Sequence, residues 1–271
     1  MSAAQGRGEI GALLARHGHR PNKRLGQHFL ADPNLVARIV TAAEVGPGDL
    51  VVEVGSGTGT LTRALAGTGA EVIGFEIDRH LEPVLAEALA GVPADIRFAD
   101  ATPAAVAAAV GQRDAVLVAN LPYATGTTLL LDVLQRVPRV VRMVVMVQRE
   151  VADRLAAPWG SRTYGLPSVV ASLRSTVTPL FRVAPTVFVP PPAVESALVE
   201  LRRIESHPLV ASAERLAAVA FAGRRKMLRR SLAGFLDDPE AVLRAAGIDP
   251  TARPEAIAPE QFLALAEAAA G

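Results

Sequence analysis

The chain has 271 residues; half of them are hydrophobic, 4% are aromatic, and the formal net charge is +1. The absence of cysteine excludes a disulfide framework, a thiolate metal site and a cysteine nucleophile. No stretch approaches the ~20 apolar residues of a membrane span, and the N-terminus has no secretory apolar run, so we expect a soluble cytoplasmic protein.

Apolar runs alternate with helical stretches from about residue 50. The predicted strands cover 49–54, 71–76, 95–99, 114–120 and 139–148, and helical patterns separate them at 61–69, 79–91 and 103–111. A helical pattern also follows residue 124, in "TGTTLLLDVL". Strands separated by helices of this length predict a parallel, doubly wound α/β sheet.

Two further apolar segments, 169–183 and 196–204, are predicted as an antiparallel pair that completes the sheet. A proline-rich loop separates them. After about residue 206 the pattern is helical only. We therefore expect a main domain over 1–205 and a small helical domain over 206–271.

Glycines follow the first strand in "VVEVGSGTGTLT", where Gly55 and Gly57 allow close approach of the backbone to a ligand. Glu76 ends the second strand, where a carboxylate can accept both hydroxyls of a ribose, and Asp100 ends the third as "FAD". Strand ends at one edge of a parallel sheet converge on one crevice. Such a crevice suits a nicotinamide dinucleotide or S-adenosylmethionine. The alternative is an ordinary turn with surface acids.

The fourth strand ends in Asn120-Leu121-Pro122-Tyr123, whereas a hydride transferase commonly carries His, Lys or a Tyr/Lys pair to handle the substrate hydroxyl or carbonyl. The Asn120 side-chain oxygen and the Leu121 carbonyl can accept hydrogen bonds from an exocyclic base amine and free its lone pair. Pro122 restricts Leu121 to an extended conformation, and Tyr123 can stack on the base. The alternative is a strand-end turn with Tyr123 in the core.

Basic residues gather in two segments, 16–24 and 224–230. The second is predicted to be a helix that Met227 and Leu228 anchor and that binds RNA phosphates; the alternative is a solvated helix face. Its cations are Arg224, Arg225, Lys226, Arg229 and Arg230. The histidines show no metal-ligand spacing, so we expect no metal.

Several ordered motifs together are similar to those of the ribosomal RNA adenine N6,N6-dimethyltransferase family of the small subunit. They are "KRLGQHFL" (23–30), "EVGSGTG" (53–59), "NLPY" (120–123), "MVQREVADRLAAPWGSRTYG" (146–165), "FVPPPAVES" (188–196) and "FAGRRKMLRRSL" (221–232). The chain departs from the commoner family pattern at His28, Ser56, Pro167 and Gly223.

This resemblance implies a Rossmann-like sheet of seven strands, mostly parallel with one antiparallel strand, that binds S-adenosylmethionine. It implies that His28 and Leu30 touch this cofactor, that Gly55 lies against its methionine part and that Asn120 borders the methyl group. It assigns Glu76 to the ribose and Asp100 to the adenine amine.

The same resemblance implies that Phe188 lies opposite Tyr123 in the base pocket. From the residues alone, Phe188 is a core side chain. The resemblance also makes Lys23 and Arg24 part of a segment that covers the cofactor and meets RNA.

The expected activity is dimethylation of N6 on two adjacent adenosines in a 3'-terminal hairpin of small-subunit rRNA, contributing to ribosome biogenesis, by a monomer. One alternative is a large-subunit rRNA adenine methyltransferase of the macrolide-resistance type. Another is a ribosome-assembly factor without essential catalysis, and a dinucleotide oxidoreductase is the most remote.

Overall fold

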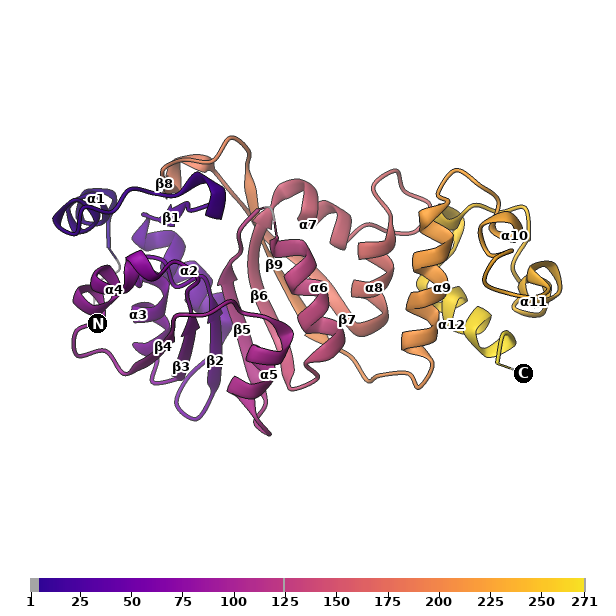
Figure 1. The fold of residues 1–271 in the computed structure, drawn as a ribbon, viewed down its shortest axis with the longest axis horizontal. Helices are drawn as coiled ribbons and strands as arrows, with labels where there is room; N and C mark the ends of the chain where they lie inside the picture. The colour runs from indigo at the N-terminus through magenta and orange to yellow at the C-terminus, as the bar shows by residue number, and fades with distance from the viewer. Residues whose placement is uncertain (1–4, 124, 271) are drawn as a thin grey trace. The chain divides into compact units, whose positions relative to one another are not determined.

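The computed structural model describes residues 5–123 and 125–270 (Figure 1). Its main sheet has seven strands in the order β4-β3-β2-β5-β6-β9-β7. Their bounds are β2 (Leu50–Val54), β3 (Glu71–Phe75), β4 (Ala94–Arg97), β5 (Ala115–Asn120), β6 (Val140–Gln148), β7 (Ser175–Val183) and β9 (Ser196–Arg203). Strands β2 to β6 pair in parallel, and β9 is antiparallel to β6. The predicted fold class is confirmed.

Helices connect the parallel strands in the predicted places. They are α3 (Thr60–Ala66), α4 (Glu82–Ala88), α5 (Pro103–Val110) and α6 (Gly126–Arg136), and α7 (Arg149–Leu155) follows β6. Small aliphatic side chains fill the core around the sheet, where Val51, Leu65, Val118 and Met146 are fully buried. The sheet order brings the carboxyl ends of β2, β3, β4 and β5 to one edge.

The N-terminal residues form elements that the sequence analysis did not predict. They are α1 (Arg7–Arg16), the 3₁₀ turn η1 (Lys23–Leu25), the short strand β1 (Phe29–Leu30) and α2 (Pro33–Ala43). Helix α2 begins where the Asp32 carboxylate accepts from the backbone N–H groups of Asn34 and Leu35, with Pro33 in its first turn. Strand β1 pairs antiparallel with β8 (Phe188–Val189), which follows the 3₁₀ turn η3 (Pro185–Val187).

The prediction of one strand over 169–183 was wrong in its first part, since α8 (Leu166–Arg174) precedes β7. Leu166, Val169, Val170 and Leu173 have the i, i+3, i+4, i+7 spacing of a helix face, and all but Leu166 are buried. The Ser168 side chain also accepts from the backbone N–H of Gly165 at 3.1 Å, which caps the helix start.

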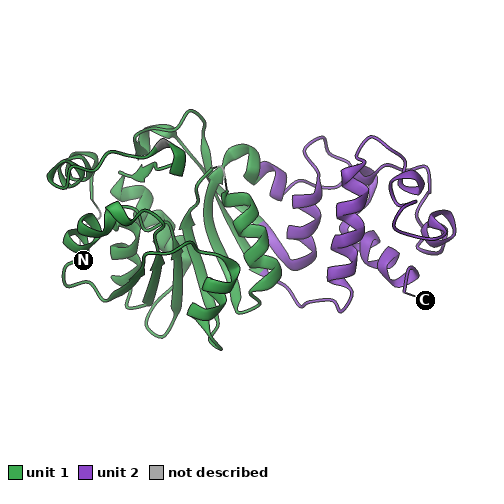
Figure 2. Cartoon of the chain, in the orientation of Figure 1, with its two compact units in different colours: residues 1–152, 178–202 green, residues 153–177, 203–271 purple. Residues whose placement is uncertain are grey.

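The chain divides into two compact units, residues 1–152 with 178–202, and residues 153–177 with 203–271 (Figure 2). The second unit contains α8 together with α9 (Val210–Ala222), α10 (Leu228–Ser231), α11 (Pro239–Ala245), the 3₁₀ turn η4 (Pro254–Ala256) and α12 (Pro259–Ala268). Its core includes the buried Tyr164, Leu216 and Phe262. The helical pattern predicted after residue 206 is confirmed.

Candidate functional site

The glycine loop lies between β2 and α3 at the carboxyl edge of the sheet. Gly55 and Gly57 have φ angles of 79° and 55°, which side-chain-bearing residues rarely adopt. A Cβ atom on Gly57 would lie 3.0 Å from the ring of Phe29. The N-terminal segment therefore packs directly on this loop.

A buried carboxyl group forms hydrogen bonds with the glycine loop. Glu53, in β2, is 1% exposed, and its Oε2 accepts from the hydroxyls of Ser56, at 3.2 Å, and Thr62. Burial raises the pKa of Glu53 to about 7, against the opposite effect of these two hydrogen bonds. Glu53 thus links the loop to the first turn of α3.

Glu76 follows β3 and faces the same loop. Its Oε2 accepts from the backbone N–H of Gly57 at 2.8 Å, and its Oε1 accepts from the backbone N–H of Asp78 at 2.9 Å. Burial raises the pKa of Glu76, while these backbone donors act in the opposite direction. Each carboxylate oxygen keeps a lone pair, so Glu76 can accept from further donors such as ribose hydroxyls.

An exposed apolar side chain lies next to Glu76 in the sequence, and it was not predicted as a site residue. Ile77 is 56% exposed although it follows a buried strand. The available indication was an apolar residue directly after a strand-end acid, and its exposed side chain offers apolar contact surface. Asp100 is also exposed, and it stands three residues beyond the last residue of β4.

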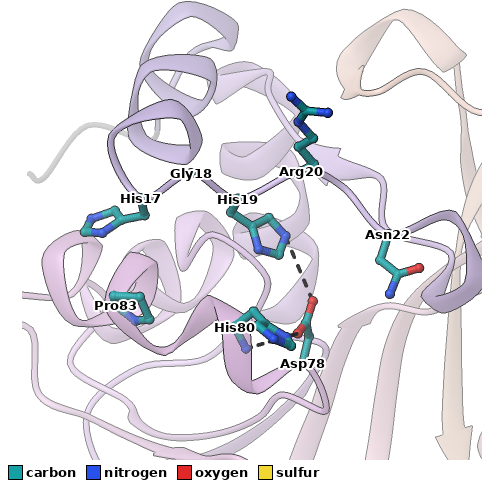
Figure 3. A pocket seen from close by; sticks show the side chains of 8 residues that line it. All are labelled: His17, Gly18, His19, Arg20, Asn22, Asp78, His80 and Pro83. Carbon is teal, nitrogen blue, oxygen red and sulfur yellow. Dashed lines mark hydrogen bonds and ion pairs between the residues drawn. The ribbon is translucent and has the colours of Figure 1, made fainter.

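Asp78 joins the N-terminal segment to the end of β3. Its Oδ2 accepts from the side-chain amide of Gln27 at 2.7 Å, and His80 Nδ1 lies 3.0 Å from Oδ1. Figure 3 shows His19 and His80 on either side of this carboxylate, in a pocket of about 540 Å³. None of the residues predicted to bind the cofactor lines that pocket, so we do not assign it to the cofactor.

Asn120 is the last residue of β5, and its side chain contacts the N-terminal segment. Its Nδ2 donates to the backbone carbonyl of His28 at 2.9 Å. A carbonyl oxygen only accepts, so this contact fixes the amide orientation and leaves Oδ1 as the acceptor for other partners. The backbone N–H of Leu121 donates to the Met146 carbonyl at 3.1 Å, which fixes the motif against β6. Pro122 accepts from the N–H of Gly126 at 2.7 Å.

Tyr123 is half-buried, and it has contacts at its hydroxyl and on its ring. Its hydroxyl lies 2.6 Å from the Ser196 hydroxyl, and burial raises its pKa. The ring of His28 stacks against it with 5.5 Å between centroids and 27° between planes. His28 Nδ1 lies 2.8 Å from the Pro190 carbonyl, so that nitrogen is the donor. The His28 side chain therefore contacts the motif and the proline-rich loop.

Phe188 and Leu30 are partners in the β1–β8 ladder and lie in the same hydrophobic core. The Phe188 side chain is fully buried, at 0% exposure. This is the core position expected from the residues alone. A contact of Phe188 with a base stays a prediction, and it requires the ring to become exposed.

The prediction that 224–230 forms one helix was wrong. Helix α9 ends at Ala222, and α10 begins at Leu228. Gly223 caps α9, and a Cβ atom there would lie 2.8 Å from the Ser231 hydroxyl, so the chain reverses closely at this point. Leu228 is buried, as the predicted anchor should be, but Met227 is 37% exposed.

The cations of this segment have different partners. Arg224 donates to the Arg162 carbonyl at 3.0 Å, and Arg229 pairs with the Glu240 carboxylate at 2.8 Å. Arg225, Lys226 and Arg230 are exposed. In the other basic segment Arg24 is exposed in η1, whereas the side chain of Lys23 lies outside the described part of the chain.

Within residues 5–123 and 125–270, no group of three or more His, Asp or Glu side chains is arranged to hold a metal ion. The described helices include none that is both long and apolar enough to cross a membrane.

Comparison with known proteins identifies the family of this chain. The sequence model of the family described as ribosomal RNA adenine dimethylase matches residues 18–270. The chain belongs to this family. The family resemblance predicted from the motifs is confirmed. The predicted activity, that of an S-adenosylmethionine-dependent rRNA adenine dimethyltransferase, is confirmed with it.

Relatives and solved structures support this membership of the adenine dimethylase family. Ribosomal RNA small subunit methyltransferase A of Phenylobacterium zucineum is 42% identical, over 94% of this chain and 90% of the relative. Ribosomal RNA small subunit methyltransferase A of Streptomyces griseus is 46% identical, over 98% of this chain and 95% of the relative. A dimethyladenosine transferase from Plasmodium falciparum has a TM-score of 0.74 and 25% identity, covering 88% of this chain and 96% of that one. The 23S rRNA methyltransferase ErmE has a TM-score of 0.68 and 27% identity, and the match covers 90% of this chain and 100% of ErmE.

Proposed function

We propose that this chain dimethylates N6 of two adjacent adenosines in a 3'-terminal hairpin of small-subunit rRNA, as a cytoplasmic monomer that contributes to small-subunit biogenesis. The identity to relatives named small subunit methyltransferase A supports the choice of subunit. The observation that carries the chemistry is the hydrogen bond from Asn120 Nδ2 to the His28 carbonyl, because it directs Oδ1 of Asn120 to another donor.

The residues present fit S-adenosylmethionine. The Gly55 and Gly57 backbone permits close approach of its methionine part, and Glu76 has free lone pairs for ribose hydroxyls. Ile77 offers apolar surface to the adenine, and Asp100 can accept from the adenine amine. When bound, this cofactor supplies an electrophilic methyl group on a sulfonium centre.

The target adenine amine is a poor nucleophile, because its lone pair is delocalised into the ring. Asn120 Oδ1 and the Leu121 carbonyl accept from its two hydrogens and favour a tetrahedral nitrogen. Transfer of the methyl group would leave the amine nitrogen cationic beside these two acceptors. Its proton is then acidic and passes to water, so the site needs no strong base.

Tyr123 holds the base flat against its ring, and its hydroxyl contact with Ser196 anchors the end of the side chain. After the first methyl transfer the amine keeps one hydrogen, so one of the two acceptors suffices for the second. Lys23 and Arg24 in the N-terminal segment, together with the cations of 224–230, are proposed to bind RNA phosphates.

Digestion of the treated rRNA to nucleosides and short fragments tests this assignment. Small subunits that lack the modification should gain dimethyladenosine at two neighbouring positions of one hairpin. Dimethyladenosine at isolated positions would contradict the proposal.

A large-subunit rRNA adenine methyltransferase is the second candidate, because the chain is similar in structure to ErmE over 90% of its length. The identity to the small-subunit relatives is higher, at 42% and 46% against 27%. We therefore favour the small-subunit substrate.

A further inference from the structure

A rigid turn in the second unit projects an aromatic side chain into solvent. The backbone N–H of Ser161 donates to the Pro158 carbonyl at 3.2 Å, and Gly160 has a φ of 79°, as the third residue of a type II turn requires. Trp159 is the second residue of this turn. The N–H of Gly160 also donates to the Glu255 carbonyl at 2.7 Å, which fixes the turn to η4.

Tyr164, which follows the turn, also attaches this segment to the residues after η4. The Tyr164 hydroxyl donates to the Ile257 carbonyl at 2.9 Å, and the Tyr164 ring is fully buried. The turn is therefore part of the packed structure of the second unit. Trp159 nevertheless remains 57% exposed, and it is the only tryptophan of the chain.

Single exposed apolar residues are ordinary on protein surfaces. Two features distinguish this one. The turn is held by hydrogen bonds on both sides, so the tryptophan is presented at a fixed place. A tryptophan side chain also has only two rotatable bonds, so it loses little conformational entropy when it binds a planar partner.

The second feature is the charge beside the turn. Arg162 is exposed, and its backbone carbonyl accepts from the guanidinium of Arg224 at 3.0 Å. Arg224, Arg225 and Lys226 are exposed as well, and the contact of Arg224 with the Arg162 carbonyl places the start of this basic segment beside the residues that follow Trp159. A partner that offers planar rings between phosphates fits this combination, and single-stranded RNA is such a partner.

We propose that Trp159 is a stacking platform for an unpaired base of the RNA, while Arg162 and the cations of 224–226 bind the adjacent phosphates. This inference rests on the proposed function, since it takes rRNA as the partner. It adds an RNA contact in which stacking, in addition to charge, contributes to affinity.

The lone tryptophan makes a direct test available, because the intrinsic fluorescence of the full chain reports on this ring. The probe is protein-free small-subunit rRNA, titrated at several salt concentrations. Stacking should quench the fluorescence at saturating RNA and protect it from acrylamide.

Trp159→Ala should weaken RNA binding about fivefold to a hundredfold, the range that corresponds to the loss of one stacked base. The slope of log K against log salt should not change, because no cation is removed. Trp159→Phe should keep most of the affinity. Phe235→Ala is a matched control, since Phe235 is another exposed aromatic of the same unit, 48% exposed, and it should bind within twofold of wild type.

Unchanged fluorescence together with Trp159→Ala binding within twofold would overturn the inference. Equal weakening by Phe235→Ala would overturn it too, because the loss would then not be specific to the turn. Weakened binding of Trp159→Ala to assembled subunits but not to protein-free rRNA would also overturn it, because the partner would then be a ribosomal protein. Methyl transfer by the wild type to small subunits tests the proposed function separately, so the two failures are distinguishable.

Discussion

The Asn120 side-chain amide lies 2.9 Å from the backbone carbonyl of His28 and donates to it. This contact joins the end of β5 to a segment 92 residues earlier in the sequence. It makes the orientation of the proposed catalytic amide depend on the order of the N-terminal segment. The stacking of His28 on Tyr123 and its hydrogen bond to Pro190 hold that segment in place.

Glu76→Ala should weaken S-adenosylmethionine binding by about 1.5–3 kcal/mol, the usual contribution of a hydrogen bond to a charged group. Calorimetric titration of the purified variant measures this loss. Glu71→Ala is the matched control, because Glu71 is exposed at the opposite end of the same strand. If both variants bind the cofactor like wild type, Glu76 does not hold the ribose.

Tyr123→Ala should weaken capture of the target base, because a stacked base contributes about 1–3 kcal/mol. Tyr123→Phe keeps the ring and loses only the hydroxyl contact with Ser196, so it should retain most of the binding. Equilibrium binding and single-turnover methylation of both variants separate these effects. If Tyr123→Phe weakens binding and methylation as much as Tyr123→Ala does, the role of Tyr123 belongs to its hydroxyl and not to its ring.

Glu53 should make the stability of the first unit depend on pH. Its folded pKa of about 7 lies above the ordinary value of 4.5, so the folded chain binds the proton more tightly than the unfolded chain. The stabilisation is complete below about pH 4.5, decreases as pH rises toward 7, and is lost above that.

Glu53→Gln removes this titration. The difference in unfolding free energy between the variant and wild type should therefore change between pH 5 and pH 7, by on the order of 1–3 kcal/mol, and be constant at higher pH. Denaturant unfolding across this range measures the difference. A difference that stays constant from pH 5 to 8 would mean that Glu53 titrates normally.

Arg225 and Lys226 should contribute to RNA binding through charge alone. Neutralising each one should reduce the slope of log K against log salt by about 0.7–0.9, with unchanged cofactor affinity. Arg229→Gln should change the slope less, because Arg229 already pairs with Glu240. Filter binding of subunits over a range of salt concentrations compares the three variants with wild type. Slopes of the Arg225 and Lys226 variants equal to that of wild type would argue against phosphate contacts.

The part of the site that depends on strand ends could be predicted from the sequence. Apolar runs separated by helices determine a parallel sheet, and Gly57, Glu76 and Asn120 then have to converge at one edge. The contacts of His28 could not be predicted. Its partners Asn120 and Pro190 are 92 and 162 residues away, and a two-residue ladder has too little pattern to reveal β1.

The errors arose where local residues suit more than one structure. The Val-Val pair at 169–170 suits a strand, but its neighbours at helical spacing and the Ser168 cap form α8. The run of cations at 224–230 suits a helix face, but Gly223 ends α9 and reverses the chain. In both places the local sequence suits two structures, and the helical spacing at 166–173 and the break at Gly223 are the ones that the chain adopts.

The most direct test is single-turnover transfer of labelled methyl groups to saturating small or large ribosomal subunits that lack the modification. Wild type should label only small subunits. Asn120→Ala should bind them with nearly unchanged affinity but react roughly 10²–10³-fold more slowly, the cost of one lost preorganised contact in a transition state. Label confined to large subunits, or a near wild-type rate for Asn120→Ala at saturation, would contradict the account.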